Sequence, residues 1–330
     1  MGNFSEHIAE DVKRELKGSR FQSTQAQNLG LSGGRIFFVL KASATNYTQF
    51  KEDHPDYISG AGVVTTAAVY NTIDEAIGAC TANQGDVIYV MPGHTEAVTN
   101  GSIALDVAGV TIIGLGSGSM KPTLSFGATN SKINVTAADG TFQNFRFTAA
   151  IADVVTAVLH ATAAQNTRYV DIEFFASAAF NFINCYTLGA ANISDGCRWE
   201  RNYLRTADVG QLALCITAAA HNDLKFYNNY VVHVATAAGL LTAGAAELLG
   251  LDVRGNFVQT GQTDGAVGVL VITTGTASSG SVVDNDMKTA DAAANVAIPI
   301  ASKVYAARNY IAGADEVGTV IAVGTLFDNT

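Results

Sequence analysis

The sequence repeats one short phrase, in which an alternating apolar stretch leads into an asparagine that an aromatic residue usually follows. The clearest copy is LKFYNNYVV at residues 224–232. The asparagines of the five copies are Asn202, Asn229, Asn256, Asn285 and Asn309, at steps of 27, 27, 29 and 24 residues. A repeat of this length without helical periodicity is typical of a solenoid whose coils are built from strands.

Each repeat carries the pattern of strands joined by tight turns. Leu224 and Phe226 alternate with Lys225 and Tyr227, and this period of two predicts a strand. A second phrase is a short apolar run that ends in Ala, Thr and Gly. It recurs at residues 158–166, 214–222, 240–248 and 271–280. Two strand phrases and two turn phrases in each repeat indicate a flattened or triangular coil.

The repeated asparagine predicts a corner of the coil. Asparagine tolerates the left-handed backbone conformation better than any residue except glycine, so we expect a sharp bend with a positive φ angle there. Neighbouring coils of a parallel stack lie about 4.8 Å apart, which lets side-chain amides bond from coil to coil. We therefore predict a ladder of the five asparagines, with Tyr203, Tyr230 and Phe257 following in register. The alternative is a row of asparagines that contacts a ligand.

Composition and charge exclude several classes of protein. The chain has 330 residues, 48% of them hydrophobic, and can bury a large core. It contains no apolar run long enough for a membrane helix and no signal-peptide pattern at its start, so we expect synthesis in a reducing cytoplasm and no membrane partner. Four cysteines lack metal-type spacing and are predicted to be core residues: Cys80, Cys185, Cys197 and Cys215.

The net charge of −10 lies on the body of the chain. Residues 1–60 carry seven basic and seven acidic side chains, and the remainder carries twelve basic and twenty-two acidic ones. A protein that binds the phosphates of nucleic acid is expected to show a basic stripe instead. The sequence therefore predicts no nucleic-acid partner.

Residues 1–60 lie outside the repeat. We predict an amphipathic helix near the start with Phe4, Ile8, Val12 and Leu16 on one stripe, and an extended arm after it. This segment either caps the first coil or attaches the protein to another subunit. The remainder, residues 61–330, is predicted to be the β-helix domain, with a short capping helix near residues 72–82.

The opening of the body carries a resemblance to a known family. YNTIDEAIGACTANQGDVIYVMPGHTEAV is followed closely by LDVAGVTIIGLGSGSMKPTLSF. These phrases resemble the opening segment of the pectate-lyase-like superfamily, in which a short helix caps the first coil of a right-handed parallel β-helix. They are also similar to uncharacterised β-helical virion proteins of tailed bacteriophages. The resemblance implies an all-β, right-handed parallel β-helix from about residue 70 onward, and a homotrimer within a virus particle.

The resemblance implies that enzymes of this superfamily use clusters of acidic residues for catalysis. The pair Asp171 and Glu173 is a weak candidate for such a catalytic site here. When Phe147, Phe175 and Tyr203 are aligned at steps of 28 residues, Phe145 and Arg201 fall in the column of Glu173. Gln143 and Trp199 fall in the column of Asp171. We therefore expect no acidic cluster to accumulate across coils.

The histidines give no metal signal either. His94 and Glu96 provide only two candidate ligands on a turn, and a zinc site needs at least three protein ligands. His160 is predicted to point inward or to line a turn. The sequence therefore predicts no metal, no cofactor and no catalytic residue.

Two functions follow from these observations. The first is a non-enzymatic virion structural protein of a bacteriophage that decorates or projects from the capsid. It would be attached through its N-terminal arm to the major capsid protein or to other virion proteins. The alternative is a glycan-binding or glycan-cleaving tailspike-type β-helix, a polysaccharide lyase or hydrolase, with a host glycan as its partner.

Overall fold

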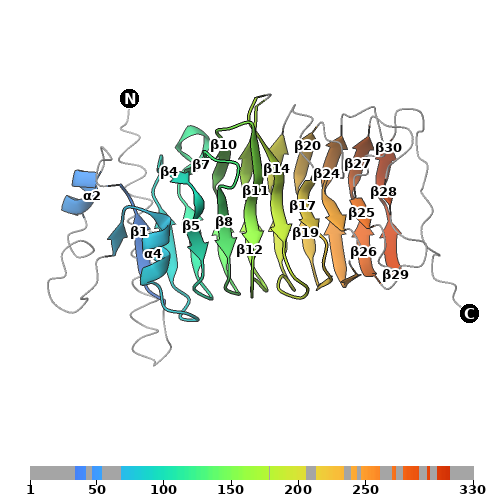
Figure 1. Cartoon of the computed structure of the whole chain (residues 1–330), viewed down its shortest axis with the longest axis horizontal. Helices are drawn as coiled ribbons and strands as arrows, with labels where there is room; N and C mark the ends of the chain where they lie inside the picture. Colours follow the sequence, from blue (N-terminus) through green and yellow to red (C-terminus); the bar gives the residue numbers. More distant parts are fainter. Residues whose placement is uncertain are drawn as a thin grey trace, which may run out of the picture.

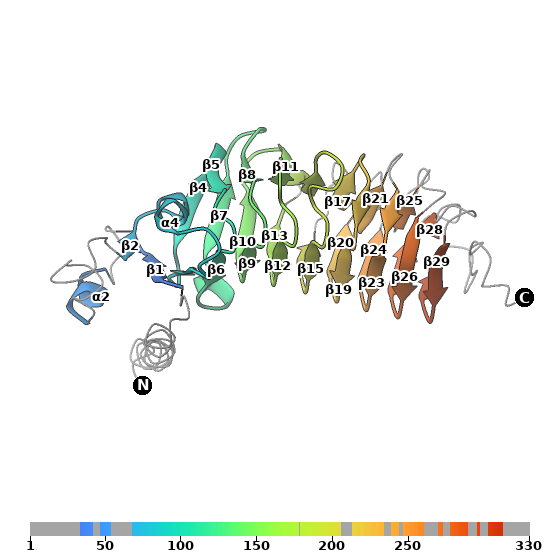
Figure 2. The same cartoon turned by 90° about the horizontal axis from the view of Figure 1, so that it is seen from below.

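The computed structural model describes residues 34–41, 47–53, 68–177, 179–205, 213–233, 239–243, 247–260, 270–272, 278–289, 296–297 and 303–312. In these residues the chain is a parallel β-helix with very little helix. Its coils stack in sequence order along the long axis of the molecule (Figures 1 and 2). The predicted all-β parallel β-helix is confirmed.

Three parallel sheets, A, B and C, form the sides of the coil. In spatial order, sheet A contains β2 (Val69–Tyr70), β1 (Ile36–Val39), β3 (Val87–Val90), β6 (Thr111–Gly114), β9 (Thr141–Gln143), β12 (Arg168–Val170), β15 (Arg198–Glu200), β19 (Lys225–Tyr227), β23 (Leu251–Arg254), β26 (Ser279–Val283) and β29 (Lys303–Ala307). The chain passes from sheet C to sheet A and then to sheet B in successive coils.

Sheets B and C complete the coils. Sheet B contains β4 (Thr95–Val98), β7 (Thr123–Phe126), β10 (Arg146–Ala149), β13 (Glu173–Phe175), β16 (Tyr203–Arg205), β20 (Tyr230–His233), β24 (Phe257–Thr260), β27 (Asp286–Thr289) and β30 (Tyr310–Ala312). Sheet C contains β5 (Asn100–Leu105), β8 (Lys132–Val135), β11 (Asp153–His160), β14 (Asn181–Leu188), β17 (Ala213–Thr217), β21 (Leu241–Ala243), β25 (Leu270–Ile272) and β28 (Val296–Ala297). A fourth, two-stranded sheet pairs β18 (His221–Asn222) with β22 (Leu248–Leu249).

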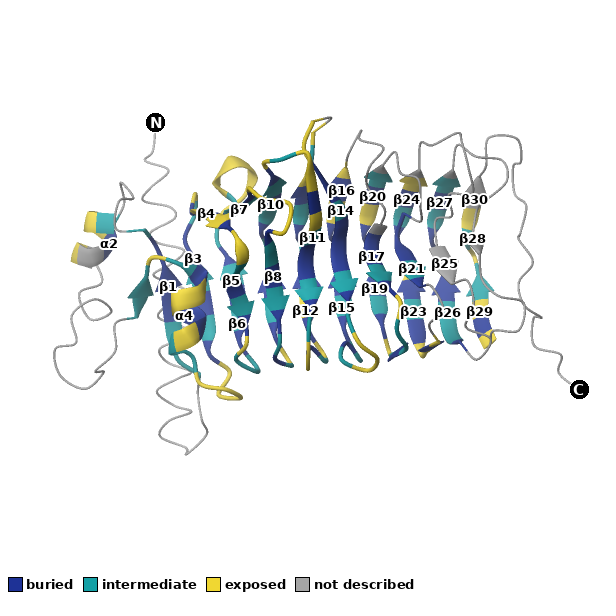
Figure 3. Cartoon of the chain, viewed as in Figure 1, coloured by how far each residue is buried: buried dark blue, intermediate teal, exposed yellow. Residues whose placement is uncertain are grey.

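Alternate strand residues point into the coil and stack there from one coil to the next. In sheet A the buried column runs through Ile112, Phe142, Tyr169, Trp199, Phe226, Val253 and Val282. The rings of Trp199 and Phe226 are nearly parallel, with centroids 4.6 Å apart. The strands alternate between buried and partly exposed residues, and many exposed residues lie at turns (Figure 3). The period of two in the sequence thus marks the core.

The corner between sheets C and A has a left-handed residue in seven successive coils of the described chain. The column there consists of Asn83, Gly109, Asp139, Asn166, Gly196, Asp223 and Gly250, with φ between 55° and 75°. Only glycine, asparagine and aspartate occupy these positions, as the steric cost of a positive φ requires.

The corner between sheets A and B holds the repeated asparagines, and here one expectation is wrong. The left-handed residues are Asn144, Asp171, Arg201, Asn228, Gly255, Asp284 and Arg308, with φ between 51° and 64°. The repeated asparagines come one position later and have no positive φ. The residue before each asparagine makes the bend, and the asparagine is then free to turn its amide inward.

The five repeated asparagines lie side by side on successive coils. The side-chain Nδ2 of Asn202 donates to Oδ1 of Asn229 at 3.1 Å, and the next three such bonds are each 2.9 Å long. Each accepting Oδ1 also accepts a hydrogen bond from the main-chain N–H of the repeated asparagine in the preceding coil, at 2.9 to 3.1 Å. Oδ1 of Asn202 accepts from the main chain of Ile172, where the row of asparagines ends.

Helix α4 (Ile73–Ala79) covers the open end of the first coils, as expected for the segment near 72–82. A capping box fixes its start, because Thr72 accepts from the Glu75 main chain and Glu75 accepts from that of Thr72. The helix buries Ile73, Ala76 and Ile77. Two other helical segments are α2 (Tyr47–Asp53) and the 3-10 turn η1 (Gly118–Met120).

Strand β1 shows that the β-helix begins before residue 61. It lies within the segment 1–60 that the sequence set apart, yet it pairs in parallel with both β2 and β3. The stripe of Phe4, Ile8, Val12 and Leu16 lies outside the described residues, so the N-terminal helix and the attachment arm stay predictions. No helix in the described part of the chain is long and apolar enough to cross a membrane.

Candidate functional site

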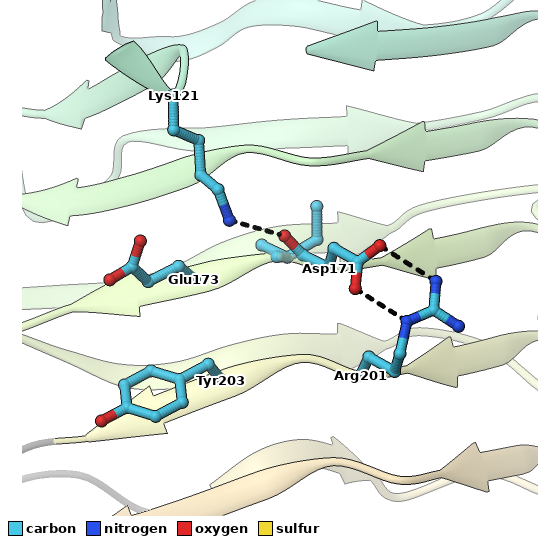
Figure 4. Close-up of a pocket in the computed structure, with 6 residues that line it drawn as sticks. Lys121, Asp171, Glu173, Arg201 and Tyr203 are labelled. Carbon is cyan, nitrogen blue, oxygen red and sulfur yellow. Dashed lines mark hydrogen bonds and ion pairs between the residues drawn. The ribbon is translucent and has the colours of Figure 1, made fainter. Parts of the chain in front are cut away.

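A depression of about 320 Å³ lies at the corner between sheets A and B (Figure 4). Its lining residues come from three coils, with one further coil between the first and the second, and are Lys121, Asp171, Ile172, Glu173, Arg201 and Tyr203. The corner places Asp171 and Arg201, strands β13 and β16 supply Glu173 and Tyr203, and Lys121 follows η1.

Asp171 and Arg201 meet because they occupy the same left-handed corner position in consecutive coils. The guanidinium binds both carboxylate oxygens, at 2.8 and 2.9 Å. A positive φ is uncommon for arginine and stores strain. This ion pair offsets the strain, and the same arrangement recurs between Asp284 and Arg308. The copies WERNYL and AARNYI place arginine where other copies have Asn, Gly or Asp, and this departure from the repeat is a sequence signal for Arg201.

Glu173 lies on the outer face of sheet B between two register partners, Arg146 and Tyr203. The expected column of Phe145 and Arg201 was wrong. The coil from Arg146 to Glu173 spans 27 residues and the next spans 30, so a constant step of 28 loses the register. Nε of Arg146 binds the Glu173 carboxylate at 3.0 Å.

Asp171 is also placed differently from the expectation. It shares its column with Asn144 and Arg201 rather than with Gln143 and Trp199. Asp171 lies at the corner before β13, so it does not share a strand face with Glu173. Both carboxylates still line the depression.

Lys121 reaches the depression from the second coil before that of Asp171 (Figure 4). Its Nζ donates to the main-chain carbonyl of Asp171 at 3.3 Å. Among the described residues no carboxylate lies within ion-pair distance of this ammonium group. No local pattern in the sequence points to Lys121, because its contact lies 50 residues later in the chain.

A row of aromatic rings begins at the depression and follows sheet B. Tyr203, Tyr230 and Phe257 lie in register, as expected. The centroids are 5.1 and 4.8 Å apart, and the planes differ by 4° and 10°. Lys288 lies over the far end of the row, 4.8 Å from the centroid of Phe257. Each ring therefore covers one face of its neighbour in the row.

Positive charge gathers around this corner although the chain is acidic. Glu200 binds Arg198 at 2.7 Å and Arg201 at 2.6 Å, and it lies 3.7 Å from Arg168. With Lys121 and Arg146, five cations stand here against three carboxylates: Asp171, Glu173 and Glu200. The local surplus of positive charge is opposite in sign to the net charge of −10.

His94 and Glu96 form a structural link. Their side chains are buried and lie 3.0 Å apart, and Glu96 accepts from the main chain of Ile73 at the start of α4. In the described residues no group of three or more histidine, cysteine, aspartate or glutamate side chains is arranged to hold a metal ion.

The inward polar cluster around His160 is fully buried. Nδ1 of His160 lies 2.8 Å from Oγ of Ser194, and Nε2 lies 2.7 Å from the hydroxyl of Tyr169. Burial, and to a smaller extent His221, lowers the pKa of His160 to about 3. This histidine is therefore a neutral, hydrogen-bonded core residue.

The four cysteines are free; Cys185, Cys197 and Cys215 are buried and Cys80 is partly buried. Burial raises the pKa of the Cys80 and Cys197 thiols to about 12 and raises that of Cys215 as well. A thiol must ionise to act as a nucleophile, so these are structural residues.

We expect His160 to make the protein less stable as the pH falls. Its folded-state pKa is below the unfolded value of about 6.5, so the unfolded chain binds the proton first, and stability falls by about 1.4 kcal/mol per pH unit between about 6.5 and 3. Urea unfolding at about pH 7.5 and pH 5 should show a loss of about 2 kcal/mol from this group. In the variant His160→Gln, the free energy of unfolding should fall by about 2 kcal/mol less over this pH range than in the parent. An equal pH dependence of stability in variant and parent would contradict the claim that His160 is neutral in the folded protein.

Comparisons with known proteins do not assign the chain to a family. No protein family matches it, and neither the curated proteins nor the solved structures give a significant match. The resemblance to the pectate-lyase-like superfamily is therefore supported at the level of the parallel β-helix alone.

Proposed function

We propose that this chain is a non-enzymatic structural protein of a tailed-bacteriophage particle. In this proposal it is a trimeric β-helix that decorates or projects from the capsid and is attached through residues 1–60. The virion would be its location, after synthesis in the host cytoplasm. The phage assignment rests on the resemblance of the GDVIYVMPG and GVTIIGLG phrases to virion β-helices.

The observation that carries the non-enzymatic assignment is that each carboxylate near the depression is bound to arginine. Asp171 forms a two-bond pair with Arg201, and Glu173 binds Arg146. Glu200 is shared among several arginines. Hydrolases on such folds need a carboxyl group that can donate a proton and a second that acts as base or nucleophile. Here arginine side chains contact all three carboxylates, so the depression presents no pair of carboxylates that is free of arginine.

The shape of the coil supports the same proposal. From β9 onward, the corners between sheets A and B consist of one left-handed residue and the residue after it. Corners this short supply no long side-chain walls for a polysaccharide cleft. Regular, short corners of this kind suit a projecting structural element.

The N-terminal segment provides the test. Deleting residues 1–30 should leave the β-type circular dichroism unchanged, because the described coils form their own core, and should abolish incorporation into particles, measured as copy number by mass spectrometry. The double variant Ile8→Asp with Val12→Asp should do the same. The matched control Lys13→Gln with Arg14→Gln changes the polar face and should incorporate normally.

Two outcomes would contradict the proposal. Normal copy number of the truncated protein would move attachment to the faces of the β-helix. The second outcome is that the protein cleaves polygalacturonate, alginate or a capsular glycan and that Asp171→Asn or Glu173→Gln abolishes the cleavage. This result would show that the chain is an enzyme.

A further inference from the structure

We propose that the outer face of sheet B is the contact surface for another copy of this chain, which lies parallel to the first with its coils in register. The inference rests on the proposed assembly of several copies and names the face by which they meet. The contact is centred on the coils of β16, β20 and β24. In each coil the first outward side chain of one copy meets the second outward side chain of the other.

The first argument is that exposed aromatic side chains gather on this face. Four of them lie on strands of sheet B and are between 37% and 54% exposed: Phe175, Tyr203, Tyr230 and Tyr310. Among the described residues, sheets A and C each contribute one large hydrophobic side chain with comparable exposure. Apolar side chains gathered on one exposed face are typical of protein–protein contact surfaces, in which aromatic residues are enriched.

The aromatic row is also held in place before any partner binds. The rings of Tyr203, Tyr230 and Phe257 stack with centroids 5.1 and 4.8 Å apart. Side chains that are already fixed lose little conformational freedom when a partner covers them. The row therefore provides a preorganised strip in the middle of the face.

The second argument is that the charges on the face suit a parallel neighbour. Outward residues of a strand are two positions apart, and a symmetry axis along the solenoid places the first of them against the second in the other copy. Asp286 then meets Lys288 of the partner subunit, as an ion pair. The ring of Tyr203 meets the guanidinium of the partner's Arg205, as a cation–π contact. No strand from β10 to β27 in sheet B carries two outward residues of like charge.

An antiparallel neighbour would bring like charges together. With Tyr230 at the centre, the coils two steps away on either side would face each other. Glu173 would then meet Asp286 of the partner subunit, and juxtaposed like charges oppose association. The charge pattern therefore favours the parallel arrangement.

The size of the face sets the expected strength of the contact. Two outward positions on each strand of sheet B from β4 to β27 give about 16 residues, fewer than the roughly 20–30 on each side of a standard interface. We therefore expect a dissociation constant in the micromolar range.

Sedimentation velocity of the full chain between about 1 and 100 µM measures this association. Tyr230→Ala should weaken it about tenfold or more, because the ring at the centre of the face is removed. The matched control Tyr305→Ala removes an exposed tyrosine from sheet A and should associate as the parent does. Thermal melting of each variant checks that it is folded.

Disulfide cross-linking tests the parallel register. A mixture of the single variants Tyr230→Cys and Val232→Cys should form a disulfide-linked heterodimer on mild oxidation, because these positions meet between copies. A mixture of Tyr230→Cys and Lys288→Cys is the control, since these positions lie two coils apart, about 10 Å along the solenoid, and should not cross-link.

Three results would overturn the proposal. The first is that the full chain stays monomeric at about 100 µM. The second is that Tyr230→Ala associates as tightly as the parent, which would place the contact on another face. The third is that Tyr230→Cys cross-links to Lys288→Cys as readily as to Val232→Cys, which would exclude the parallel register. Each of these results leaves the virion role open to its own test, because copy number in particles is measured separately.

Discussion

Replacing Trp199 by alanine is expected to cost about 3 to 5 kcal/mol of stability. This side chain is fully buried in the middle of the solenoid and stacks on Phe226 at 4.6 Å. It also contacts the rings of Tyr169 and Tyr186. Neighbouring coils are held by their ladders, so they cannot close the space and a cavity remains. Urea unfolding followed by far-ultraviolet circular dichroism measures the loss.

The control is Trp199→Phe, which keeps a ring in the stack. Nε1 of the indole has no hydrogen-bond acceptor among the described residues, so the substitution removes no hydrogen bond. We expect a cost of about 1 to 2 kcal/mol from the smaller volume alone. Equal stability of Trp199→Ala and the parent would show that the interior is not packed as described.

Replacing Asn229 by valine is expected to cost at least about 3 kcal/mol, because buried groups lose their partners. Asn229 is 1% exposed. Its Oδ1 accepts from both the main chain and the side chain of Asn202, and its Nδ2 donates to the carbonyl of Trp199. Valine has a similar shape but replaces none of these bonds. Fluorescence of the single tryptophan during urea unfolding reports the change.

The neighbouring residue gives a matched control for the ladder. Asn228 makes the left-handed bend at φ 54°, and glycine occupies the same column one coil later, at Gly255. Asn228→Gly therefore keeps the bend and should change stability by less than about 1 kcal/mol. If Asn228→Gly were as damaging as Asn229→Val, the bend and not the amide row would hold this corner.

Local patterns in the sequence determined the fold class. Alternation of apolar and polar residues within each repeat gives strands with one buried face, as in the column from Phe142 to Trp199 and Phe226. The recurring asparagine marks the same corner of each coil, because an inward amide there can bond to the coils before and after. Helix α4 follows from its capping box, whose residues are close in sequence.

The side chains that meet across coils were decided by the tertiary structure. Which residues of two coils lie side by side depends on the number of residues in each coil. At the corner between sheets A and B this number varies from 24 to 30. A slip of one residue turns an outward position inward, so a constant period placed Glu173 and Asp171 in the wrong columns. The correct register pairs Glu173 with Arg146 and Asp171 with Arg201.

The candidate site shows the same division. The sequence by itself determined that Tyr203 follows a ladder asparagine and that Asp171 and Glu173 lie near each other. Only the folded coils brought Lys121 to the carbonyl of Asp171 and placed Tyr203 beside Glu173. The physical reason is that the alternation of a strand depends only on neighbouring residues. Which residues of two coils come into contact depends instead on the lengths of all the strands and turns between them.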